Sequence, residues 1–513
     1  MIPNPHITSG LFVDLYALTM AQTTWRANDL KRRSKSEIFF REPISTSTTI
    51  VPYFVISGIA SFFKWFNSWS ISEERKEFLA NITAATGEKI FEKEFINFIS
   101  NPKWDLTFEF IPEGELAFPG EPVGYVSGPH WQTQLIEAAV LNCITAETIW
   151  ATIASQYYIA AQTDTKRAKL YDFGARRVPE FGGLRVARNA YLAGWDGSST
   201  LEPCYIYGIP AAGTVAHSFI MSQRSQKQAF KIWAENNLEA LNVCLPDTYG
   251  TQRGMLDFLE ACKDLSIPPK GVRIDAGDPD YFSRLIRQML DKAGYKNAAI
   301  MYSNAASLSD VYNLMRNEAP IDSFGIGTHL SRQSIDETKT SAVMKICETT
   351  DELGTFNIMK FSDDSIKSGV PGYHKIARII GANGNYAGDI LYREDLTTLG
   401  NTTLDTEIFS YTSIPGRNPF KVFPSDAQYY NPMVFFMKNG KHVFSEFDGL
   451  QDDKKILSDS RNRFLKSIAK LDTAHKNIIN QRLYVVGIEE SLHKEIESAI
   501  HNNIMANNRL KEI

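Results

Sequence analysis

Between residues 169 and 360 the sequence alternates short apolar segments with helical patterns, and this alternation restricts the possible folds more than any other feature. The apolar segments, which we interpret as strands, lie at 169–173, 204–207, 242–245, 271–274, 298–302, 322–326 and 356–360. The helical patterns that fill most of the gaps include 251–264, 278–293 and 307–317. Strands that recur about every 25–35 residues with helices between them form βα units, whose strands pair in parallel. The segment therefore predicts a parallel sheet or an α/β barrel.

The part of the chain before this segment has a different pattern. The sequence predicts helices at 11–25 and 53–67 and a strand at 37–41. Residues 107–126 contain short strand-like runs separated by prolines and glycines, which is typical of a small β-rich layer. A long apolar stripe at 131–162 predicts a helix that connects this part to the alternating segment.

The alternation fades at about residue 390. Beyond it, the sequence predicts a hairpin turning at Asn439-Gly440, together with helices at 458–470 and 489–510 and a strand at 484–486. We therefore predict three parts: an N-terminal α+β domain at 1–140, an α/β barrel catalytic domain at 141–390, and a C-terminal segment at 391–513 that packs with the N-terminal domain.

Charge and cysteine content limit the partners and the cellular compartment. The 54 Lys and Arg residues against 59 Asp and Glu residues give a formal net charge of -5, which argues against nucleic acid as a main partner. The five cysteines contain no CxxC pair and indicate neither a disulfide framework nor a zinc site. The N-terminus lacks the pattern of a signal peptide, and no uncharged apolar run reaches the roughly 18 residues that a membrane span needs. We expect a soluble cytoplasmic protein with reduced thiols and no membrane contact.

Charged side chains follow two of the predicted strands. In parallel α/β folds the carboxyl ends of the strands open on one face, where such folds carry their chemistry. In Asp172-Phe-Gly-Ala-Arg-Arg177, the two guanidiniums can bind phosphate or carboxylate, or form a solvated pair, and Phe173 offers a face to a planar ligand. In Arg273-Ile-Asp-Ala-Gly-Asp278, one cation and two acids leave an apolar strand, a combination that suits an anion, a sugar hydroxyl or Mg²⁺.

A small-residue loop, Gly213-Thr-Val-Ala-His-Ser-Phe219, carries a histidine between hydroxyl residues. The loop follows the strand predicted at 204–207 and a break at Gly208 and Pro210. This setting suits His217 as a nucleophile or an acid–base group, although a single histidine is also compatible with a structural role. The residues at the neighbouring strand ends therefore decide between the two.

The remaining predicted strand ends add hydroxyls, an amide and a pair of glycines. Ser199 lies in a hydroxyl-rich loop, Asp247-Thr248 follow one strand, and Ser303-Asn304 end another. In Phe324-Gly-Ile-Gly-Thr328 the glycines allow backbone N–H groups to approach an anion and Thr328 adds a hydroxyl, as in a phosphate cradle. Because no Gly-x-Gly-x-x-Gly follows the first strand, the inventory suits transfer of a phosphorylated sugar better than hydride transfer.

Ordered motifs along nearly the whole chain resemble the nicotinate phosphoribosyltransferases, which are type II members of the phosphoribosyltransferases. The motifs are Asp14-Leu-Tyr-Ala-Leu-Thr-Met20, Glu113-Gly114 with Pro119-Gly-Glu-Pro122, Asp172–Arg177, Gly208–Ser218, Arg273–Asp278, Gly325-Ile-Gly-Thr328, and Pro371-Gly372 with Lys375. With this resemblance the predicted fold class is α/β, an irregular TIM-like barrel with an additional α+β domain from the N-terminal and C-terminal parts.

The resemblance implies that nicotinate reacts with phosphoribosyl pyrophosphate to give nicotinate mononucleotide and pyrophosphate, coupled to ATP hydrolysis and with Mg²⁺ as cofactor. It implies a homodimer with shared active sites, in which Tyr16 from the neighbouring subunit stacks on nicotinate opposite Phe173. His217 matches the histidine that the family phosphorylates from ATP, with Arg273 and Asp275 as further catalytic residues. The other implied substrate contacts are Arg176 at the anionic substrates, Ser199 and Thr214 at the nicotinate carboxylate, Asp278 at the ribose or Mg²⁺, Asn304 near the ribose phosphate, and Gly325, Gly327 and Thr328 at the 5′-phosphate.

Three other readings remain open from the sequence. Nicotinamide phosphoribosyltransferase shares the fold, but its position matching Ser199 is acidic, and an acid there would repel the carboxylate of nicotinate. A catalytically silent relative is permitted because Ala305-Ala306 depart from the usual polar residues after Ser303-Asn304. A barrel lyase or aldolase would need a Schiff-base lysine at a strand end, for which Lys360 is the candidate.

Overall fold

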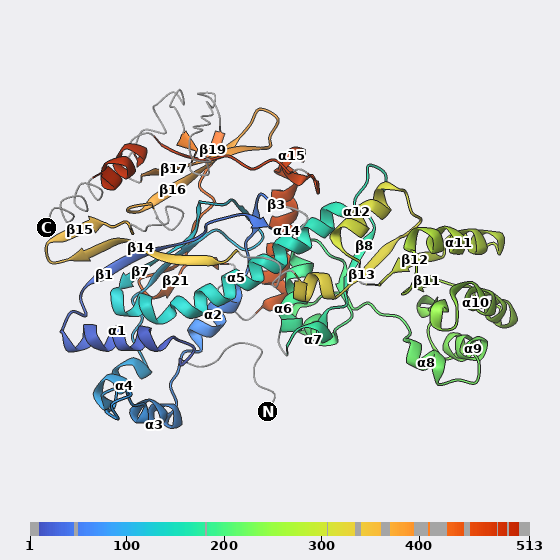
Figure 1. Cartoon of the computed structure of the whole chain (residues 1–513), viewed down its shortest axis with the longest axis horizontal. Coiled ribbons are helices and arrows are strands. Elements are labelled where there is room, and N and C mark those ends of the chain that lie inside the picture. The colour runs from blue at the N-terminus through green and yellow to red at the C-terminus, as the bar shows by residue number, and fades with distance from the viewer. Residues whose placement is uncertain are drawn as a thin grey trace. The chain divides into compact units, whose positions relative to one another are not determined.

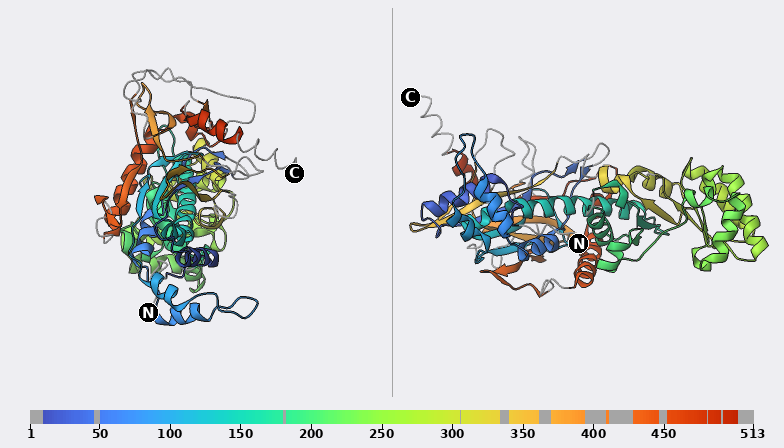
Figure 2. Two further views of the ribbon diagram at one scale, coloured as in Figure 1. Left: turned by 90° about the vertical axis from the view of Figure 1, so that its left-hand side faces the viewer. Right: turned by 90° about the horizontal axis from the view of Figure 1, so that it is seen from below.

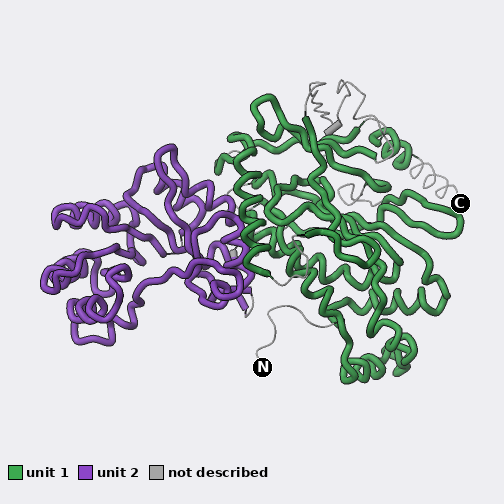
Figure 3. Tube along the Cα trace, turned by 180° about the vertical axis from the view of Figure 1, so that it is seen from behind, with its two compact units in different colours: residues 1–152, 338–513 green, residues 153–337 purple. Residues whose placement is uncertain are grey.

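The computed structural model forms two compact units (Figure 3). Unit 1 contains residues 1–152 and 338–513, and unit 2 contains residues 153–337. Unit 1 is therefore assembled from two stretches of chain that are separated in sequence by the whole of unit 2. The structure describes residues 10–45, 50–179, 182–304, 306–333, 340–360, 370–393, 409–410, 428–445, 452–479, 481–489 and 492–501.

Unit 2 is organised around a six-stranded parallel sheet (Figure 1). Its strands, in spatial order, are β10 (Val243–Cys244), β11 (Gly271–Ile274), β12 (Ala299–Tyr302), β13 (Ser323–Ile326), β8 (Lys169–Asp172) and β9 (Gly197–Ser198). Every neighbouring pair is parallel, which confirms the predicted βα units. The pairing of β13 with β8 places two segments that are distant in sequence side by side within the sheet.

The TIM-like barrel expected from the sequence is not confirmed. Within the described part of unit 2, the pairing runs from β10 to β9, and no strand joins these two ends. The strand β9 has only two residues, and Ser198 continues the pairing through a single parallel bridge to Ala211. The structure thus shows a mixed α/β fold with an open parallel sheet.

The strand predicted at 204–207 is wrong, because Leu201–Tyr207 form the helix α7. Gly208 ends this helix in the left-handed conformation, with φ at 69°, which glycine adopts without steric cost. Leu201 and Tyr205, four residues apart, are both exposed. The apolar run that resembled a buried strand is a short helix with an apolar exposed side.

The strand predicted at 356–360 also lies elsewhere. It corresponds to β15 (Gly354–Asn357), which pairs antiparallel with β14 in unit 1 and not with the parallel sheet. All four residues of β15 are exposed, as is common for an edge strand. Its length and composition alone could not show which sheet it joins.

Three helices of unit 2 begin at residues whose side chains accept hydrogen bonds from backbone N–H groups of the first turn. Ser225, Asp278 and Ser307 each accept a hydrogen bond from the first turn of α9, α11 and α12, respectively. Ser307 and Asp310 form a reciprocal capping box. Besides α7, the helices of unit 2 are α6 (Gly182–Leu192), α8 (His217–Met221), α9 (Gln226–Asn236), α10 (Thr251–Leu265), α11 (Pro279–Lys292) and α12 (Leu308–Arg316). The helices predicted at 251–264, 278–293 and 307–317 are therefore confirmed as α10, α11 and α12.

Unit 1 contains a seven-stranded antiparallel sheet. Its order is β15, β14 (Ala342–Asp351), β1 (Arg33–Phe40), β7 (Pro122–Pro129), β5 (Thr107–Phe110), β20 (Val434–Lys438) and β21 (Lys441–His442). The predicted hairpin turns at Asn439 and Gly440, which both have positive φ, at 47° and 75°. Unit 1 also contains the helices α1 (Leu15–Arg26), α2 (Ile59–Asn67), α3 (Glu73–Asn81), α4 (Lys93–Ser100), α14 (Asp453–Lys470) and α15 (Thr473–Lys476), most of α5 (His130–Ala160), and helical residues at 492–501.

Aromatic rings fill the core of unit 1 between α2 and this sheet. Phe62 and Phe63 on α2 each lie 5.4 Å, centroid to centroid, from the ring of Phe108 on β5. Phe63 also stacks on Phe436 of β20 at 5.8 Å. Edge-to-face and stacked contacts of this kind add to the stabilisation from burial. The aromatic cluster predicted in 53–67 is therefore core.

The helix α5 (His130–Ala160) is continuous over its whole length (Figures 1 and 2). By length and composition it is the one helix of the described residues that could cross a membrane. However, 67% of its most apolar window is buried inside the protein, as in the core helix of a globular domain.

A second sheet of unit 1 surrounds a buried arginine. The order is β18 (Phe409–Ser410), β22 (Val486–Ile488), β17 (Tyr386–Arg393), β16 (His374–Ile380) and β19 (Gln428–Tyr430). Arg378 on β16 is fully buried and donates to Asp389 at 2.8 Å, to Glu121 at 3.1 Å and to Glu115 at 3.3 Å. One guanidinium thus joins segments near residues 115–121 to strands that follow residue 370.

Candidate active site

Arg273, at the carboxyl end of β11, is the centre of the candidate site in unit 2. Its Nε donates to Ser303 Oγ at 2.7 Å, and its Nη1 donates to Thr214 Oγ1 at 3.0 Å. Its Nη2 donates to Asp275 Oδ1 at 2.9 Å. The guanidinium carbon also lies 5.8 Å from the ring centroid of Phe173. One cation therefore brings together four residues that the sequence placed in separate segments.

Asp275 is a carboxylate held by several donors. Its Oδ1 accepts from Ser303 Oγ at 2.5 Å as well as from Arg273, and its backbone N–H donates to Asp247 Oδ2 at 2.8 Å. Burial raises the pKa of Asp275, but the hydrogen bonds from Ser303 and Arg273 and the charge of Arg273 together lower it below the ordinary value. Asp275 therefore presents a negative charge at neutral pH.

His217 is the first residue of α8, and not part of a loop that leaves a strand, as the sequence suggested. Its Nδ1 lies 3.0 Å from Thr248 Oγ1. Its Nε2 lies 3.4 Å from Asp275 Oδ2 and 3.8 Å from Asp247 Oδ1. Two carboxylates facing Nε2 favour the tautomer that carries its proton there. Nδ1 is then the unprotonated nitrogen of the ring, and its lone pair accepts a hydrogen bond from the hydroxyl of Thr248.

Two glycines of β13 and its following residues allow Phe173 to lie close to the strand. A Cβ atom added at Gly325 would lie 2.5 Å from Cε2 of the Phe173 ring, and one added at Gly327 would lie 2.8 Å from the Phe173 carbonyl oxygen. The backbone N–H of Phe173 donates to the carbonyl of Ile326 at 2.8 Å. Both glycines thus make room for Phe173 because they lack a Cβ atom. The phosphate contact predicted for them stays a prediction.

The other predicted contacts lie at or near the same ends of the sheet with fewer mutual contacts. Ser199 is exposed, and its backbone N–H donates to the Asp172 carbonyl at 2.9 Å. Arg176 is exposed on a 3-10 turn, Asn304 is exposed after β12, and Thr328 is half-buried after β13. Their substrate roles stay predictions.

Asp278 has a structural role that the sequence analysis did not assign. Its Oδ1 accepts the backbone N–H groups of Asp280 at 2.9 Å and Tyr281 at 3.0 Å, which caps α11. An aspartate immediately before a proline and a helical pattern is a recognisable capping signal. The contact of Asp278 with ribose or Mg²⁺ stays a prediction.

Three residues that contact Asp275 or His217 follow predicted strands but do not belong to the predicted site. They are Asp247, Thr248 and Ser303, which contact Asp275 or His217. Asp247-Thr248 directly follow β10 in the turn Pro246–Thr248. The signal that could have identified them was their position beside the acids of β11, because β10 and β11 pair.

Tyr16 belongs to unit 1, on α1, and its side chain is about half exposed. Partial burial and the negative charges of Glu137 and Asp14 raise the pKa of its hydroxyl. Its predicted stacking on nicotinate in a dimer stays a prediction.

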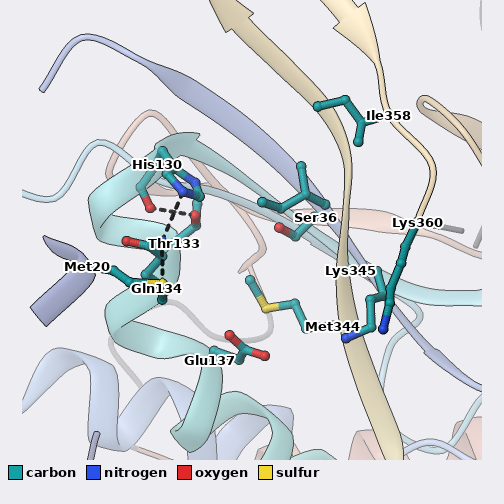
Figure 4. A pocket seen from close by; sticks show the side chains of 11 residues that line it. Met20, Ser36, His130, Thr133, Gln134, Glu137, Met344, Lys345, Ile358 and Lys360 are labelled. Carbon is teal, nitrogen blue, oxygen red and sulfur yellow. Dashed lines mark hydrogen bonds between the residues drawn. The ribbon is translucent and has the colours of Figure 1, made fainter. Parts of the chain in front are cut away.

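A pocket of unit 1 lies near this helix (Figure 4). Its volume is about 450 Å³, and Met20 of α1 is among its lining residues. Lys345 and Lys360 point into it, and Glu137 approaches from α5. Burial lowers the pKa of Lys345, against the opposing effect of Glu137. Because Lys360 lies in unit 1 after β15, it does not occupy the strand end of the parallel sheet that the lyase or aldolase reading required.

Comparison with known proteins gives the family. Residues 11–145 match the model of the nicotinate phosphoribosyltransferase (NAPRTase) N-terminal domain, and residues 168–376 match the model of the NAPRTase family. The chain is 34% identical over 325 residues to nicotinate phosphoribosyltransferase pncB2 of Mycobacterium tuberculosis, a match that covers 63% of this chain and 66% of that protein. It is 25% identical over 552 residues to nicotinate phosphoribosyltransferase of Caenorhabditis elegans, covering 95% of this chain and 92% of that protein.

The fold agrees with these matches. The crystal structure of human nicotinic acid phosphoribosyltransferase superimposes with a TM-score of 0.73 at 21% identity, over 96% of this chain and 100% of that one. Two family models in the expected order along the chain, together with this shared fold, account for both units. The chain belongs to the nicotinate phosphoribosyltransferase family.

Proposed function

We propose that this protein joins nicotinate to phosphoribosyl pyrophosphate, giving nicotinate mononucleotide and pyrophosphate for the synthesis of NAD. The observation that carries the proposal is the network of Arg273, Asp275 and His217 at the strand ends of unit 2, in a chain that belongs to this family. A pre-arranged cation, a carboxylate and a histidine suit a reaction whose substrates are anionic and whose transition state separates charge.

In the proposed step, the pyridine nitrogen of nicotinate forms a bond to the anomeric carbon of the ribose. The bond between that carbon and the pyrophosphate oxygen breaks, and pyrophosphate leaves with the electron pair. The sugar carries positive charge in between, so Asp275 stabilises it while Arg273 offsets the negative charge of the substrates. Arg273 is already oriented for this by its bonds to Ser303 and Thr214.

We further propose that His217 accepts a phosphoryl group from ATP. Nδ1 attacks the γ-phosphorus, ADP leaves, and the proton on Nε2 stays shared with Asp275, which supports the cationic ring while the bond forms. Water later hydrolyses the phosphohistidine to phosphate. The support for this step is the contrast between the two ring nitrogens, since Nε2 faces carboxylates and Nδ1 faces only a hydroxyl among its hydrogen-bonding neighbours.

Mg²⁺ is proposed as the cofactor, and the residues present fit it. The buried Asp247 Oδ1 has no hydrogen-bond partner in the described part of the chain, and Asp275 lies beside it. The described residues form no ready cluster of three or more His, Cys, Asp or Glu ligands, but Mg²⁺ is commonly held by one or two carboxylates together with substrate phosphates. Asp247 and Asp275 would hold the ion. When bound, it would neutralise charge on the phosphates of the substrates.

Nicotinate is the proposed substrate rather than nicotinamide because Ser199 presents a hydroxyl where an acid would repel a carboxylate. Phe173, fixed against β13, offers one face to the pyridine ring, and Tyr16 of a second subunit would cover the other in a dimer. The proposed compartment is the cytoplasm, where free thiols such as the five cysteines of this chain stay reduced.

The test is an assay of the purified protein with labelled nicotinate and, separately, with labelled nicotinamide, each with and without ATP. We expect nicotinate mononucleotide, formed faster when ATP is present. Mononucleotide only from nicotinamide would show the other substrate class. Absence of both products with a folded protein that still binds nicotinate would identify a silent relative.

A further inference from the structure

Asp172, the last residue of β8, has a carboxylate that is completely buried at the edge of the candidate site. Its Oδ1 accepts the backbone N–H of Gly174 at 2.9 Å. Its Oδ2 accepts the hydroxyl of Ser198, on the neighbouring strand β9, also at 2.9 Å. Both donors are uncharged. A buried carboxylate that two neutral groups hold is costly to retain, which points to a role beyond packing.

The two donors belong to two segments of the proposed nicotinate site, which are the turn after Phe173 and the loop that contains Ser199. Gly174 is in the turn that follows Phe173, and a Cβ added there would lie 2.9 Å from Asp172 Oδ1, so the turn is wrapped closely around the carboxylate. Ser198 precedes Ser199, whose own N–H donates to the Asp172 carbonyl at 2.9 Å. Asp172 thus fixes the aromatic face and the hydroxyl loop relative to each other.

Ser198 also connects Asp172 to residues 210–214, which precede His217 in the chain. Its N–H donates to the Pro210 carbonyl at 3.1 Å, and its carbonyl accepts from Ala212 at 2.9 Å. Two residues after Ala212 comes Thr214, which accepts from Arg273. Loss of the hydrogen bond between Asp172 and Ser198 would therefore loosen three segments, which are the turn at Gly174, the loop of Ser199 and residues 210–214.

We propose that Asp172 is a positioning residue for nicotinate. It sets the spacing between Phe173 and the loop of Ser199 through Gly174 and Ser198, without contacting the substrate itself. The inference rests on the proposed function and deepens it, since it assigns the geometry of the pyridine subsite to a residue outside the predicted catalytic set.

This role makes nicotinate binding depend on pH, because the carboxylate of Asp172 can be protonated. Burial raises the pKa of Asp172 to about 6, against the lowering effect of the bonds from Ser198 and Gly174. A proton on Oδ1 would face the N–H of Gly174, which can only donate, and a proton on Oδ2 would require the Ser198 hydroxyl to turn and accept, so protonation weakens the hold of the carboxyl group on these two segments. The binding of nicotinate should weaken as pH falls through about 6.

The titratable and charged groups on the adjoining elements do not replace this carboxylate. The thiol of Cys204 on α7 contacts the carbonyls of Ser198 and Thr200, and burial together with the charge of Asp172 raises its pKa. The buried Arg188 on α6 lies over the ring of Tyr207, at 5.9 Å. Asp196, before β9, pairs with Arg167.

The experiment compares Asp172→Asn with wild type and with Asp196→Asn as a matched control. The asparagine keeps an acceptor for Gly174 but cannot titrate and cannot accept as a carboxylate from Ser198. We expect KM for nicotinate to rise about tenfold, as for the loss of one hydrogen bond to a charged group, with KM for phosphoribosyl pyrophosphate nearly unchanged. The rise of KM for nicotinate below pH 6 should disappear in this variant and persist in Asp196→Asn.

An unchanged KM for nicotinate with an unchanged acid limb, or an equal rise in KM for both substrates, would overturn the proposal. If Asp172→Asn does not fold, Ser198→Ala takes its place and should raise KM for nicotinate selectively. Wild-type protein that forms no mononucleotide at any pH would refute the proposed function itself. In that case the role of Asp172 is decided by nicotinate binding to wild type and variant across the same pH range.

Discussion

Nε2 of His217 lies 3.4 Å from Oδ2 of Asp275, whose other oxygen accepts hydrogen bonds from Arg273 and Ser303. The histidine is therefore coupled through one carboxylate to the arginine at the centre of the site. A change in the charge of the ring, as on phosphorylation, acts on the same carboxylate that orients Arg273. In the proposed mechanism, this coupling is the physical route by which ATP would affect the binding of phosphoribosyl pyrophosphate.

Replacing His217 with alanine should separate the two reactions. We expect His217→Ala to lose ATP hydrolysis that depends on turnover, because the proposed phosphoryl acceptor is absent, and to retain slow formation of mononucleotide without ATP. The check is release of ADP measured together with product under the same conditions. ATP coupling that persists in this variant would exclude His217 as the acceptor.

Replacing Asp275 with asparagine should be more damaging than removing its neutral partner. Asp275→Asn removes the carboxylate to which Arg273 donates, and the loss of a half-buried hydrogen-bonded charge of this kind costs about 2–3 kcal/mol, so kcat/KM should fall roughly 100-fold. Ser303→Ala is the control and should lose less, because it removes a neutral hydroxyl that donates to Asp275 at 2.5 Å and accepts from Arg273 at 2.7 Å but leaves both charges in place. Equal losses in the two variants would show that Asp275 acts only through its geometry.

Substitution of Ser199 tests substrate choice. Ser199→Asp should lower kcat/KM for nicotinate about 10–100-fold through repulsion of its carboxylate, and raise the relative rate with nicotinamide. Ser199→Ala is the matched control, since it removes the hydroxyl without adding charge. The measurement is competition between the two labelled substrates. If Asp and Ala variants discriminate alike, position 199 does not contact the carboxylate.

The buried arginine of unit 1 predicts a stability effect. Arg378→Met removes the only cation that hydrogen-bonds Asp389 and Glu121 among the described contacts of those two carboxylates, so the free energy of unfolding should fall by about 3–5 kcal/mol. The exposed pair of Arg26 and Glu92 is the control, and Arg26→Met should cost about 1 kcal/mol or less. Denaturant unfolding checks both values.

The same cluster predicts how stability depends on pH. Burial, with the charge of Asp389, raises the pKa of Glu121 well above its ordinary value, despite the lowering effect of Arg378. The folded protein therefore keeps this proton over a range in which the unfolded chain has lost it. The contribution of Glu121 to stability is thus greatest at low pH and falls as pH rises above the ordinary carboxyl pKa. Glu121→Gln should flatten this slope, and an unchanged slope would show that Glu121 is ionised in the folded state.

The sequence predicted those parts of the fold that depend on local pattern. The strands at 271–274, 298–302 and 322–326 were placed within a residue, because fully buried parallel strands are continuous apolar runs between helices. The strand predicted at 204–207 was wrong because a run of four apolar residues cannot distinguish a strand from a short helix. The sheet joined by β15 depends on pairing with β14, which periodicity does not encode.

For the candidate site, too, the sequence predicted some residues and missed contacts that depend on the folded chain. Arg273 and Asp275 could be predicted because their motif combines opposite charges at the end of a strand, and Thr214 was implied by the resemblance to the family. The contact of Asp275 with Asp247 could not, because it joins residues 28 apart through the pairing of two strands. The carboxylate of Asp172 was part of a recognised motif, but its importance depends on complete burial, which only the folded chain reveals.

The assembly of unit 1 from two stretches of chain has a consequence during synthesis. The strand β1 pairs with β14, so that Arg33 lies opposite Thr350, and β5 pairs with β20. At about 5–20 residues per second, the ribosome needs roughly 15–60 seconds to make the 300 or so residues between the two strands of the first pair. Unit 2 is contiguous in the chain and emerges complete during this interval. During this interval β1 and β5 can pair with β7, but the other side of each strand stays without its final partner. Such an unpaired strand edge in a nascent chain is prone to aggregation.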